Sequence, residues 1–528
     1  MAAFAGGDDI GAVVAEIGHY ATKIGWAGDD APRSYFPSNV AVLRQEDKLR
    51  RIQGVHHDFY THPIQRKTFD DGNWETCNPI NPTSGLMYDP DSTQGSDGLD
   101  LLRDFLHHGY STALQQAKIE EHPFLMIERS YNTPAIRQQT LECLMEEMNV
   151  PAAFIAKDAV LMCYGCGRTT ATVVDIGHSG TTVTPVFEGF AETKGIRRSP
   201  TGVRAMDQLI LERLDALYKT KQPAAHDGIR PLYQVRPVQQ YLDPEGQTLP
   251  RPQRRPSIHF AARMELAREC REFGAGAAVN ITDTAFHAPS KSYTLPDGTV
   301  LDVPSVDRFA AADLVLGSSP ATVELREQHL EDCRSNLKKI IEKSQFDDNE
   351  DDDEEKSEKD DKFSEEAAVG LSKRRNKQQA TQKQKQQPSR LFSNRQMNRA
   401  CTKHLQTLLD DQLTAFPVAS MVCDAAYRCD REQQAALLGN VVLGGGGSCL
   451  GPTEQAVPDY LRDQIESLIH AHTPGWRVRL LTPSLSERAI LSWLGGSILG
   501  SLGNFHEMWI SKQEYEEWGS AIVNRKCP

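Results

Sequence analysis

The sequence predicts an α/β protein of two related halves that face one cleft, and three observations lead to this prediction. A strand, a tight glycine turn and a second strand occur twice, at residues 13–26 and 173–189. A third glycine cluster, at residues 443–451, follows another apolar strand. The chain has 528 residues, 39% of them apolar, so it can bury two or more cores.

The two glycine hairpins have the same design. In each, a β-branched run reaches an acidic residue, Glu16 or Asp175, and Ile-Gly-His precedes a second apolar strand. A tight turn of this kind can point backbone amides at a phosphate, and the acidic residue can hold magnesium through water. The alternative is a pair of ordinary core hairpins whose glycines only satisfy turn geometry. The repetition favours a clamp around one nucleotide.

The third glycine cluster, LGGGGSCLG, lies between an apolar strand at residues 440–443 and an amphipathic helix at residues 457–470. A strand, a glycine loop and a helix in this order often cradle a phosphate or a nucleoside. A glycine run is also often only a flexible loop. Together with the hairpins, the cluster predicts a third wall of the same site.

The charge of the chain is concentrated in one segment. The formal net charge is −14, and residues 347–361 contain 11 acidic residues against Lys356 and Lys359, which accounts for −9 of it. The remainder is only mildly acidic, and no broad basic excess favours nucleic-acid binding by the whole molecule. We therefore expect protein partners rather than direct DNA contact.

Cysteine use and hydropathy indicate a soluble intracellular protein. The 11 scattered cysteines suit a reducing compartment better than a disulfide framework, and we expect buried structural thiols, including the CxxC of Cys163 and Cys166. No apolar stretch reaches the roughly 20 residues that a membrane-spanning helix needs, and no cleavable leader is evident.

Several long segments resemble the actin family. They occur in the family's order, cover about three quarters of the chain, and comprise residues 26–38, 120–161, 167–177, 292–303 and 493–528. The last segment, WLGGSILGSLGNFHEMWISKQEYEEWGSAIVNRKCP, is similar to an actin carboxyl terminus. The resemblance implies duplicated ribonuclease-H-like α/β halves around a nucleotide cleft, with four subdomains.

The resemblance also implies domain boundaries. The first half would comprise residues 10–160 and 500–528, with a subdomain-2-like part at about 39–85. The second half would comprise residues 161–344 and 391–499, with a subdomain-4-like part at about 219–316. Residues 345–390 would be a disordered charged insertion.

Within the family, the details resemble the nuclear actin-related group of chromatin complexes more than conventional actin. The features that carry this are Tyr20, Lys157 followed by a residue other than glutamine, the RRSPTG run at residues 197–202, and the terminal RKCP. The resemblance therefore implies a nuclear protein.

The nucleotide pocket of actin can be carried over residue by residue. The matching or replacing positions are Gly18, His19, Tyr20, Lys23, Asp175, Gly177, His178, Gly445, Gly446 and Gly447, with Asp175 and Glu16 facing magnesium. Glu16 stands where actin has Asp, and His19, Tyr20 and His178 replace smaller or acidic residues. Bulky groups on a phosphate-binding turn push the amides away from a ligand, although His and Tyr can donate hydrogen bonds themselves.

The residues that would support hydrolysis are changed. Hydrolysis needs a residue that orients and polarises the attacking water. Asp158 replaces the actin glutamine, Thr182 replaces a nearby histidine, and Ala489 replaces a lysine beside the base. We expect a pocket that binds ATP with magnesium and hydrolyses it at most very slowly, or an empty structural pocket. No catalytic residue is predicted.

An insertion interrupts the second half. Leu325, Leu330, Leu337 and Ile340 have helical spacing, so residues 321–343 should form a helix. Residues 345–390 are an acidic block beside a basic, Gln-rich block and should be disordered. The segment is either a solvated tail or a contact for histones, and KRRNK at residues 373–377 is a candidate nuclear-import signal.

Two further segments depart from actin. Residues 219–256 are rich in proline and should form a surface loop of the second half. Residues 44–82 do not resemble the filament-contacting loop of actin. Since a filament needs compatible surfaces at both ends of each subunit, we expect no homopolymer.

The groove by which actin accepts partner helices is kept. The similar positions are Tyr164, Gly167 and Thr169 on one wall and Leu499, Leu502 and Met508 on the other. Adaptable apolar side chains suit helix-in-groove recognition, although a plain core face would show the same pattern. The resemblance implies nuclear actin and the helicase-SANT-associated helix of a remodelling ATPase or acetyltransferase scaffold as partners.

Three hypotheses follow from the sequence. The first is a non-catalytic architectural subunit of chromatin-remodelling and histone-acetyltransferase complexes. The second is an actin-like ATP-binding cytoskeletal protein with weak ATPase activity. The third is an acidic histone-binding chaperone, which depends on the insertion alone.

Overall fold

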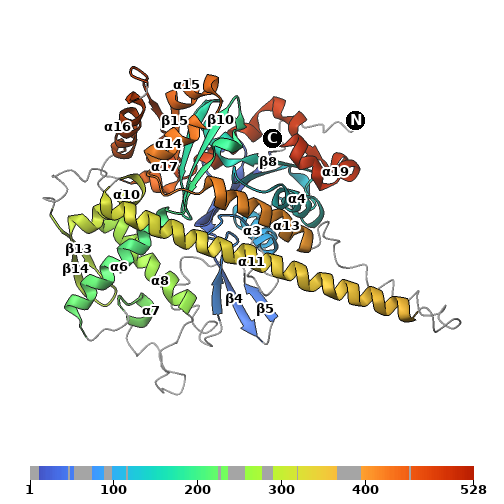
Figure 1. Cartoon of the computed structure of the whole chain (residues 1–528), viewed down its shortest axis with the longest axis horizontal. Coiled ribbons are helices and arrows are strands. Elements are labelled where there is room, and N and C mark those ends of the chain that lie inside the picture. Colours follow the sequence, from blue (N-terminus) through green and yellow to red (C-terminus); the bar gives the residue numbers. More distant parts are fainter. Residues whose placement is uncertain are drawn as a thin grey trace, which may run out of the picture.

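The computed structural model describes residues 11–45, 48–52, 74–87, 98–114, 117–223, 228–235, 256–275, 289–317, 319–365, 394–450, 454–471 and 473–528. Within them, the predicted α/β fold with two related halves is confirmed, because two separate mixed sheets carry the two predicted hairpins (Figure 1). No helix in this part of the chain is both long and apolar enough to cross a membrane.

The first half is built on a six-stranded sheet of order β17-β8-β7-β1-β2-β3. Its strands are β1 (Val13–Ile17), β2 (Ala21–Trp26), β3 (Ser34–Pro37), β7 (Phe124–Glu128), β8 (Ala152–Lys157) and β17 (Ile510–Ser511). β1 and β2 are antiparallel, whereas β1, β7 and β8 are parallel. Every residue of β1 and β7 is buried, as is typical of parallel strands covered on both faces.

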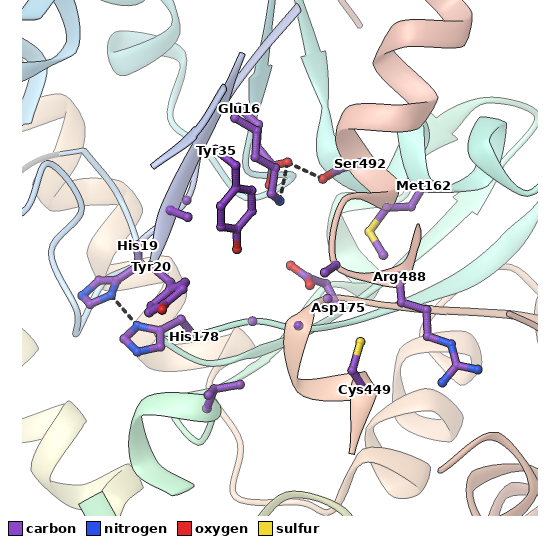
Figure 2. Close-up of a pocket in the computed structure, with 18 of the residues that line it drawn as sticks. Glu16, His19, Tyr20, Tyr35, Met162, Asp175, His178, Cys449, Arg488 and Ser492 are labelled. Carbon is purple, nitrogen blue, oxygen red and sulfur yellow. Dashed lines mark hydrogen bonds and ion pairs between the residues drawn. The ribbon is translucent and has the colours of Figure 1, made fainter. Parts of the chain in front are cut away.

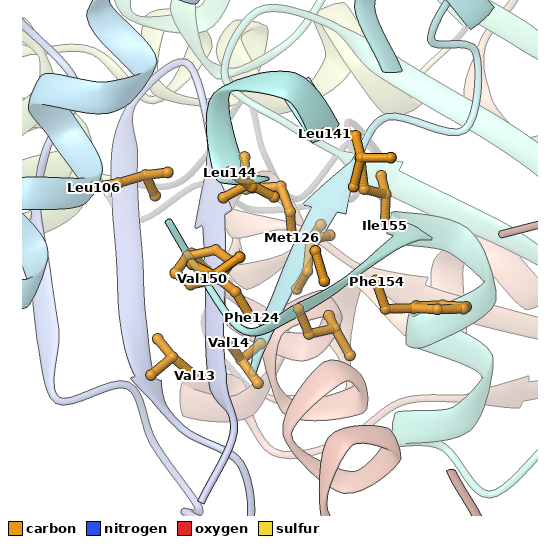
Figure 3. Packing of buried hydrophobic residues seen from close by; sticks show 14 of the residues in the cluster. Val13, Val14, Leu106, Phe124, Met126, Leu141, Leu144, Val150, Phe154 and Ile155 are labelled. Atoms are coloured by element: carbon orange, nitrogen blue, oxygen red, sulfur yellow. The ribbon is translucent and has the colours of Figure 1, made fainter. Parts of the chain in front are cut away.

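Helices complete the core of this half. They are α3 (Gly98–Ala113), α4 (Pro134–Glu142), α5 (Asp158–Gly165), α18 (Leu491–Ser501), α19 (Lys512–Trp518) and α20 (Val523–Lys526). The predicted boundaries at residues 160 and 500 fall within α5 and α18, and both helices are counted here because Leu161 and Trp493 belong to this core. Figure 3 shows Val14, Phe124 and Met126 of the sheet packed in one cluster with Leu106 and Leu144. The core therefore lies on both sides of the strands that lead to the cleft.

The second half repeats the plan on a sheet of order β11-β10-β9-β15-β16, with β12 paired to β10. Its strands are β9 (Ala171–Ile176), β10 (Thr181–Phe187), β11 (Phe190–Ala191), β12 (Arg197–Ser199), β15 (Asn440–Gly444) and β16 (Arg479–Leu481). As in the first half, the first strand of the hairpin pairs with a later strand in parallel. The internal duplication read from the sequence is thus a duplication of topology.

The helices of the second half include the one predicted after the glycine loop. They are α6 (Val203–Lys221), α7 (Leu232–Val235), α8 (Pro256–Glu269), α10 (Ser305–Leu316), α14 (Val418–Tyr427), α15 (Arg431–Gly439), α16 (Ala456–His470) and α17 (Leu485–Arg488). The hairpin of β13 (Lys291–Thr294) and β14 (Val300–Val303) lies near α6 and α8 in Figure 1. A second small sheet, β5-β4-β6, is formed by β4 (Val40–Gln45), β5 (Lys48–Ile52) and β6 (Trp74–Cys77).

The helix α18 is held against α5 by a close backbone approach. A Cβ atom at Gly495 would overlap the carbonyl oxygen of Leu161, so only glycine fits there. Trp493 is fully buried, and its indole Nε1 donates to the carbonyl oxygen of Val14 at 3.1 Å. The motif WLGGS therefore attaches α18 to both α5 and β1.

Cys527, in the terminal RKCP, is part of the core of the first half. Cys527 is fully buried, and its sulfur accepts a hydrogen bond from the amide of Ile155 at 3.5 Å. Its carbonyl oxygen accepts from Arg137, which also forms an ion pair with Glu128. Lys526 pairs with Glu514 at 2.7 Å. These contacts anchor this end of the chain in the first half.

A helical insertion joins the two halves. The helix predicted at residues 321–343 is present as the first part of α11 (Pro320–Glu365), and α13 (Asn394–Thr407) packs beside it. A buried cluster combines Leu330 and Leu337 of α11 with Leu405 of α13 and Ile136 of α4. Since α4 belongs to the first half, these helices fasten one half to the other.

The disorder expected for residues 345–390 stays a prediction, although the first part of this stretch is helical in the structure. The structure continues α11 to Glu365 (Figure 1, yellow). Once packing has formed the first turns, each further residue adds a hydrogen bond at low cost, and this stretch contains no Gly or Pro. Residues 366–393, which include KRRNK, lie outside the described residues, as do residues 53–73 and 236–255 of the two departing loops.

Candidate functional site

The turn of the first hairpin closes on itself. The amide of Gly18 donates to the carbonyl oxygen of Ala21 at 3.0 Å, and a side chain at Gly18 would press on the same oxygen. The carbonyl oxygens of His19 and Tyr20 accept from Asn78 and from the amide of Ser38. The turn is therefore held by its own half.

The turn of the second hairpin repeats this bond. The amide of Gly177 donates to the carbonyl oxygen of Gly180 at 3.0 Å. The amides of Val203 and Arg204, in the first turn of α6, donate to the carbonyl oxygens of Gly177 and His178. In both hairpins the glycine amide predicted to face a phosphate is thus engaged within its own turn.

The two turns meet through their histidines. His19 Nδ1 and His178 Nδ1 are 2.7 Å apart, and the rings stack with centroids 4.8 Å apart (Figure 2). One ring must donate and the other accept, so the accepting ring cannot take a proton on Nδ1 while they share this bond. Burial, and then the charge of Arg204, lowers the pKa of His178 to about 3. Burial and His178 likewise hold the pKa of His19 well below its ordinary value.

Tyr20 extends this contact. Its ring centroid lies 5.2 Å from that of His178, and the guanidinium carbon of Arg268, on α8, lies 5.1 Å from the centre of the Tyr20 ring. Burial raises the pKa of the Tyr20 hydroxyl, which stays protonated at neutral pH. The three bulky replacements noted in the sequence therefore form one bridge between the halves.

The acidic residue of the first hairpin is already paired. Lys23 Nζ lies 2.9 Å from Glu16 Oε2, and the Ser492 hydroxyl donates to the same oxygen at 2.7 Å (Figure 2). Burial alone would raise the pKa of Glu16, but Lys23, Arg129 and Ser492 together keep it below its ordinary value. Glu16 is thus a charged, fully partnered carboxylate.

The acidic residue of the second hairpin is paired with an arginine of the other half. Arg129 Nη1 lies 3.2 Å from Asp175 Oδ2 and 3.4 Å from Asp158 Oδ2. Burial raises the pKa of Asp175 to about 6 in spite of Arg129. Asp158 also accepts from the amide and hydroxyl of Ser130 and from the amide of Ala159. Asp158 is therefore fixed in place, and its oxygens are already engaged rather than free to act on a water molecule.

The third glycine cluster has two roles. Gly445 has φ +84°, and a side chain there would strike Asp175, so glycine is required. Gly446 has no atom within 4 Å of an added Cβ and lines the pocket. Gly447 is packed behind the wall against Ile176 and does not line the pocket, in contrast to the prediction.

These elements enclose a cavity of about 330 Å³, near the lower limit for small-molecule sites. Of the predicted nucleotide residues, all except Gly447 line it. The lining residues that sequence reasoning missed include Tyr35, Arg129, Arg268, Arg271, Glu272 and Cys449. Arg129 had a usable signal, because it directly follows the apolar strand FLMIE and strand ends face the cleft in this topology.

The residues predicted to form the partner groove lie on α5 and α18 or in the segments that follow these helices. Tyr164 and Leu499 both pack against the cluster of the first half. Gly167 and Thr169 are exposed, and the carbonyl oxygen of Thr169 accepts from the amide of Gly189. Leu502 and Met508 are 45% and 39% exposed.

Ile498 adds to this apolar surface. It lies on the last turns of α18 and is 40% exposed, although the sequence analysis did not select it. Leu502 follows the helix, and Met508 ends the 3-10 segment Gly503–Met508. We refer to Ile498, Leu502 and Met508 as the carboxyl-terminal apolar surface.

Comparison with known proteins identifies the family. A family model described as Actin matches residues 7–528. The chain belongs to the actin family.

Individual relatives point to one group within the family. The chain is 26% identical over 543 residues to actin-related protein 4 of Oryza sativa subsp. indica, covering 99% of this chain and all of the relative. It is 24% identical to actin-related protein 4 of Arabidopsis thaliana, again over 99% and 100%. The protein of the same name from Schizosaccharomyces pombe is 25% identical, over 99% of both chains. The chain is thus an actin-related protein, in agreement with the group expected from the sequence.

The actin family implies a nucleotide with magnesium in this cleft, and the residues present do not suit the metal. Among the described residues, no group of three or more His, Cys, Asp or Glu side chains could hold a metal ion. Glu16 and Asp175, the two predicted metal-facing acids, each have a basic partner of their own. Lys23, Arg129, Arg268 and Arg271 also line the cavity, and each lies beside an acidic partner: Glu16, Asp175, Glu265 and Asp207, respectively.

Proposed function

We propose that the chain is a non-catalytic structural subunit of nuclear chromatin-remodelling and histone-acetyltransferase complexes. In this role it pairs with actin on the helicase-SANT-associated helix of a remodelling ATPase or scaffold subunit. The likeness to actin-related protein 4 over 99% of the chain supports this assignment. The observation that carries it is the carboxyl-terminal apolar surface.

That surface suits an amphipathic helix. Ile498, Leu502 and Met508 are all exposed, whereas the nearby side chains of Trp493, Phe505 and Trp509 are buried. A helix that lays one face into an apolar groove needs such side chains, and Met adapts readily to a partner. When another protein covers such a surface, apolar area is removed from water and the free energy of the system falls.

The cleft supports a subunit that does not turn over substrate. Asp158, which replaces the actin glutamine, accepts three hydrogen bonds and faces Arg129. Ala489 lines the cavity without a polar group. Since Asp158 is engaged in this way, it is not available to orient a water molecule, which argues against the alternative of an actin-like cytoskeletal ATPase. A histone contact through the acidic insertion remains a proposal that rests on its charge alone.

The test is affinity purification of the full chain from nuclear extract, with identification of the co-purifying proteins. We expect a remodelling ATPase or acetyltransferase scaffold together with actin. Leu502→Asp should lose these partners by placing a charge in the apolar contact. Leu468→Asp is the matched control, because Leu468 is similarly exposed, at 42%, but lies on α16. Recovery of cytoskeletal proteins alone, or equal recovery by both variants, would contradict the proposal.

A further inference from the structure

The side chain of Arg129 lies between one carboxylate of each half. Arg129 directly follows β7 of the first sheet, and Asp175 lies near the end of β9 in the second sheet. Asp158 begins α5 after β8. One nitrogen of the guanidinium reaches both acids, at 3.2 Å to Asp175 and 3.4 Å to Asp158. Arg129 is therefore an ionic link across the cleft.

The link is largely removed from solvent. The side chains of Arg129, Asp175 and Asp158 are 21%, 18% and 9% exposed. Two carboxylates at this depth repel each other and are poorly solvated unless a cation lies between them. Arg129 supplies that cation, and a guanidinium cannot lose its charge in a protein.

A divalent cation would serve the same two carboxylates. Magnesium prefers a small octahedral shell of oxygen ligands and binds through one or two carboxylates together with phosphates and water. The guanidinium already uses the facing oxygens of Asp175 and Asp158, and the third acid, Glu16, is used by Lys23 and Ser492. A metal ion would have to displace Arg129 from its ion pair. The positive guanidinium of Arg129 would then lie unpaired beside the positive metal ion.

We propose that Arg129 is a built-in cation that takes the place of the divalent metal between the halves, so that the cleft binds nucleoside triphosphate without metal. The phosphates would face Lys23, Arg268 and Arg271, which line the cavity. Each of these side chains is already paired with an acid, Glu16, Glu265 and Asp207, so a polyphosphate would have to share or replace these partners. The inference concerns the cleft and is independent of the partner surface.

Metal binding by the protein without nucleotide gives the first test. Purified full-length chain is titrated with Mn²⁺, and bound Mn²⁺ is measured by electron paramagnetic resonance. Arg129→Ala frees Asp175 and Asp158, and should bind Mn²⁺ at least about 10-fold more tightly than the wild type. Arg129→Ala combined with Asp175→Asn should lose this gain. Arg129→Lys, which keeps the charge, should remain close to the wild type.

A matched control separates the cation from a general loosening of the cleft. Arg198 also crosses between the halves, because it donates to the Tyr131 hydroxyl and to the carbonyl oxygen of Thr83, but neither bond involves a carboxylate. Arg198→Ala should weaken the contact between the halves without any gain of Mn²⁺ affinity. A gain equal to that of Arg129→Ala would contradict the proposal.

ATP binding gives the second test. The dissociation constant for ATP is measured by calorimetry with Mg²⁺ and with EDTA. The wild type should differ by less than about 3-fold between the two conditions, and Arg129→Ala should bind at least about 10-fold more weakly in EDTA than in Mg²⁺. A wild type that loses ATP on addition of EDTA overturns the proposal.

Two further outcomes are decisive. An Arg129→Ala chain that is folded by circular dichroism and binds Mn²⁺ no better than the wild type contradicts the role of Arg129. If the wild type binds no ATP in either condition, the nucleotide part of the proposal is wrong. Neither result affects the partner surface, which the purification with Leu502→Asp tests separately.

Discussion

The cleft and the carboxyl-terminal apolar surface differ in what their side chains contact. In the cleft, polar side chains are bound to one another: His19 to His178, and Asp175 to Arg129. On the carboxyl-terminal surface, Leu502 and Met508 contact solvent. The polar side chains of the first region have partners within the chain, whereas the apolar side chains of the second are open to solvent. This contrast supports the proposed role as a subunit that a partner binds.

The largest expected effect on stability concerns α11 and α13, the helices whose buried cluster joins the two halves. Leu337 of α11 is fully buried in the cluster that joins the halves. Leu337→Ala should lower the free energy of unfolding by about 3 to 4 kcal/mol, because it removes buried methyl groups and leaves a cavity. Leu325→Ala, at a partly exposed position of the same helix, should cost clearly less. Urea unfolding measures both, and equal losses would show that the cluster does not hold the halves.

A smaller effect on stability is expected at α18, the helix that contributes residues to both the cleft and the carboxyl-terminal apolar surface. Gly495→Ala forces a Cβ against the carbonyl oxygen of Leu161 and should cost about 2 to 3 kcal/mol, in spite of the better helix propensity of Ala. It should also weaken partner binding, because α18 moves away from α5. Gly503→Ala is the control, since nothing lies within 4 Å of its added Cβ. A stable Gly495→Ala chain would show that α18 is not held in this way.

The histidine pair gives a pH-dependent effect of about 1 kcal/mol. The pKa of His178 is lowered to about 3, so its contribution to stability is present above pH 6.5 and is lost progressively as the pH falls toward 3. Between pH 7 and 5.5 the wild type should lose about 1 kcal/mol through this group. His178→Gln should remove that loss while keeping a hydrogen bond to His19.

Asp175 acts in the opposite direction in both proteins. Its pKa is raised to about 6, so its contribution is present at low pH and is lost as the pH rises through 6. The difference between wild type and His178→Gln therefore isolates the histidine. Parallel stability curves for the two proteins between pH 7 and 5.5 would contradict the buried neutral pair.

The smallest effect on stability is expected at Leu502, and it best separates the carboxyl-terminal apolar surface from the cleft. Leu502→Asp replaces a side chain that is 45% exposed, so the free energy of unfolding should change by less than about 0.5 kcal/mol. The same change should weaken binding of the partner helix by more than about 10-fold, because it places a charge in an apolar contact. Thermal unfolding and a titration with the partner helix measure the two effects. A large loss of stability would instead make Leu502 a core residue.

The sequence alone determined the parts of this protein that depend on local pattern. The strands of the two hairpins, the strand and helix around the glycine loop and the start of α11 follow from hydrophobic periodicity and glycine placement, and they are present as predicted. The resemblance of residues 493–528 to the family was equally readable. The end of α11 could not be read from the sequence. Charge and composition predict that this stretch packs poorly, but they do not exclude that a helix already nucleated by packing continues into it.

Only the tertiary structure decided how the cleft is closed. Sequence reasoning selected His19 and His178 separately, 159 residues apart, as replacements at a phosphate site, and their bond exists because two sheets face each other. It missed Arg129, whose partners lie 29 and 46 residues further along the chain. Pairing across a cleft depends on which strand ends meet in space, and no local pattern encodes that distance. The sequence therefore supplied the side chains, whereas the fold decided which of them pair across the cleft.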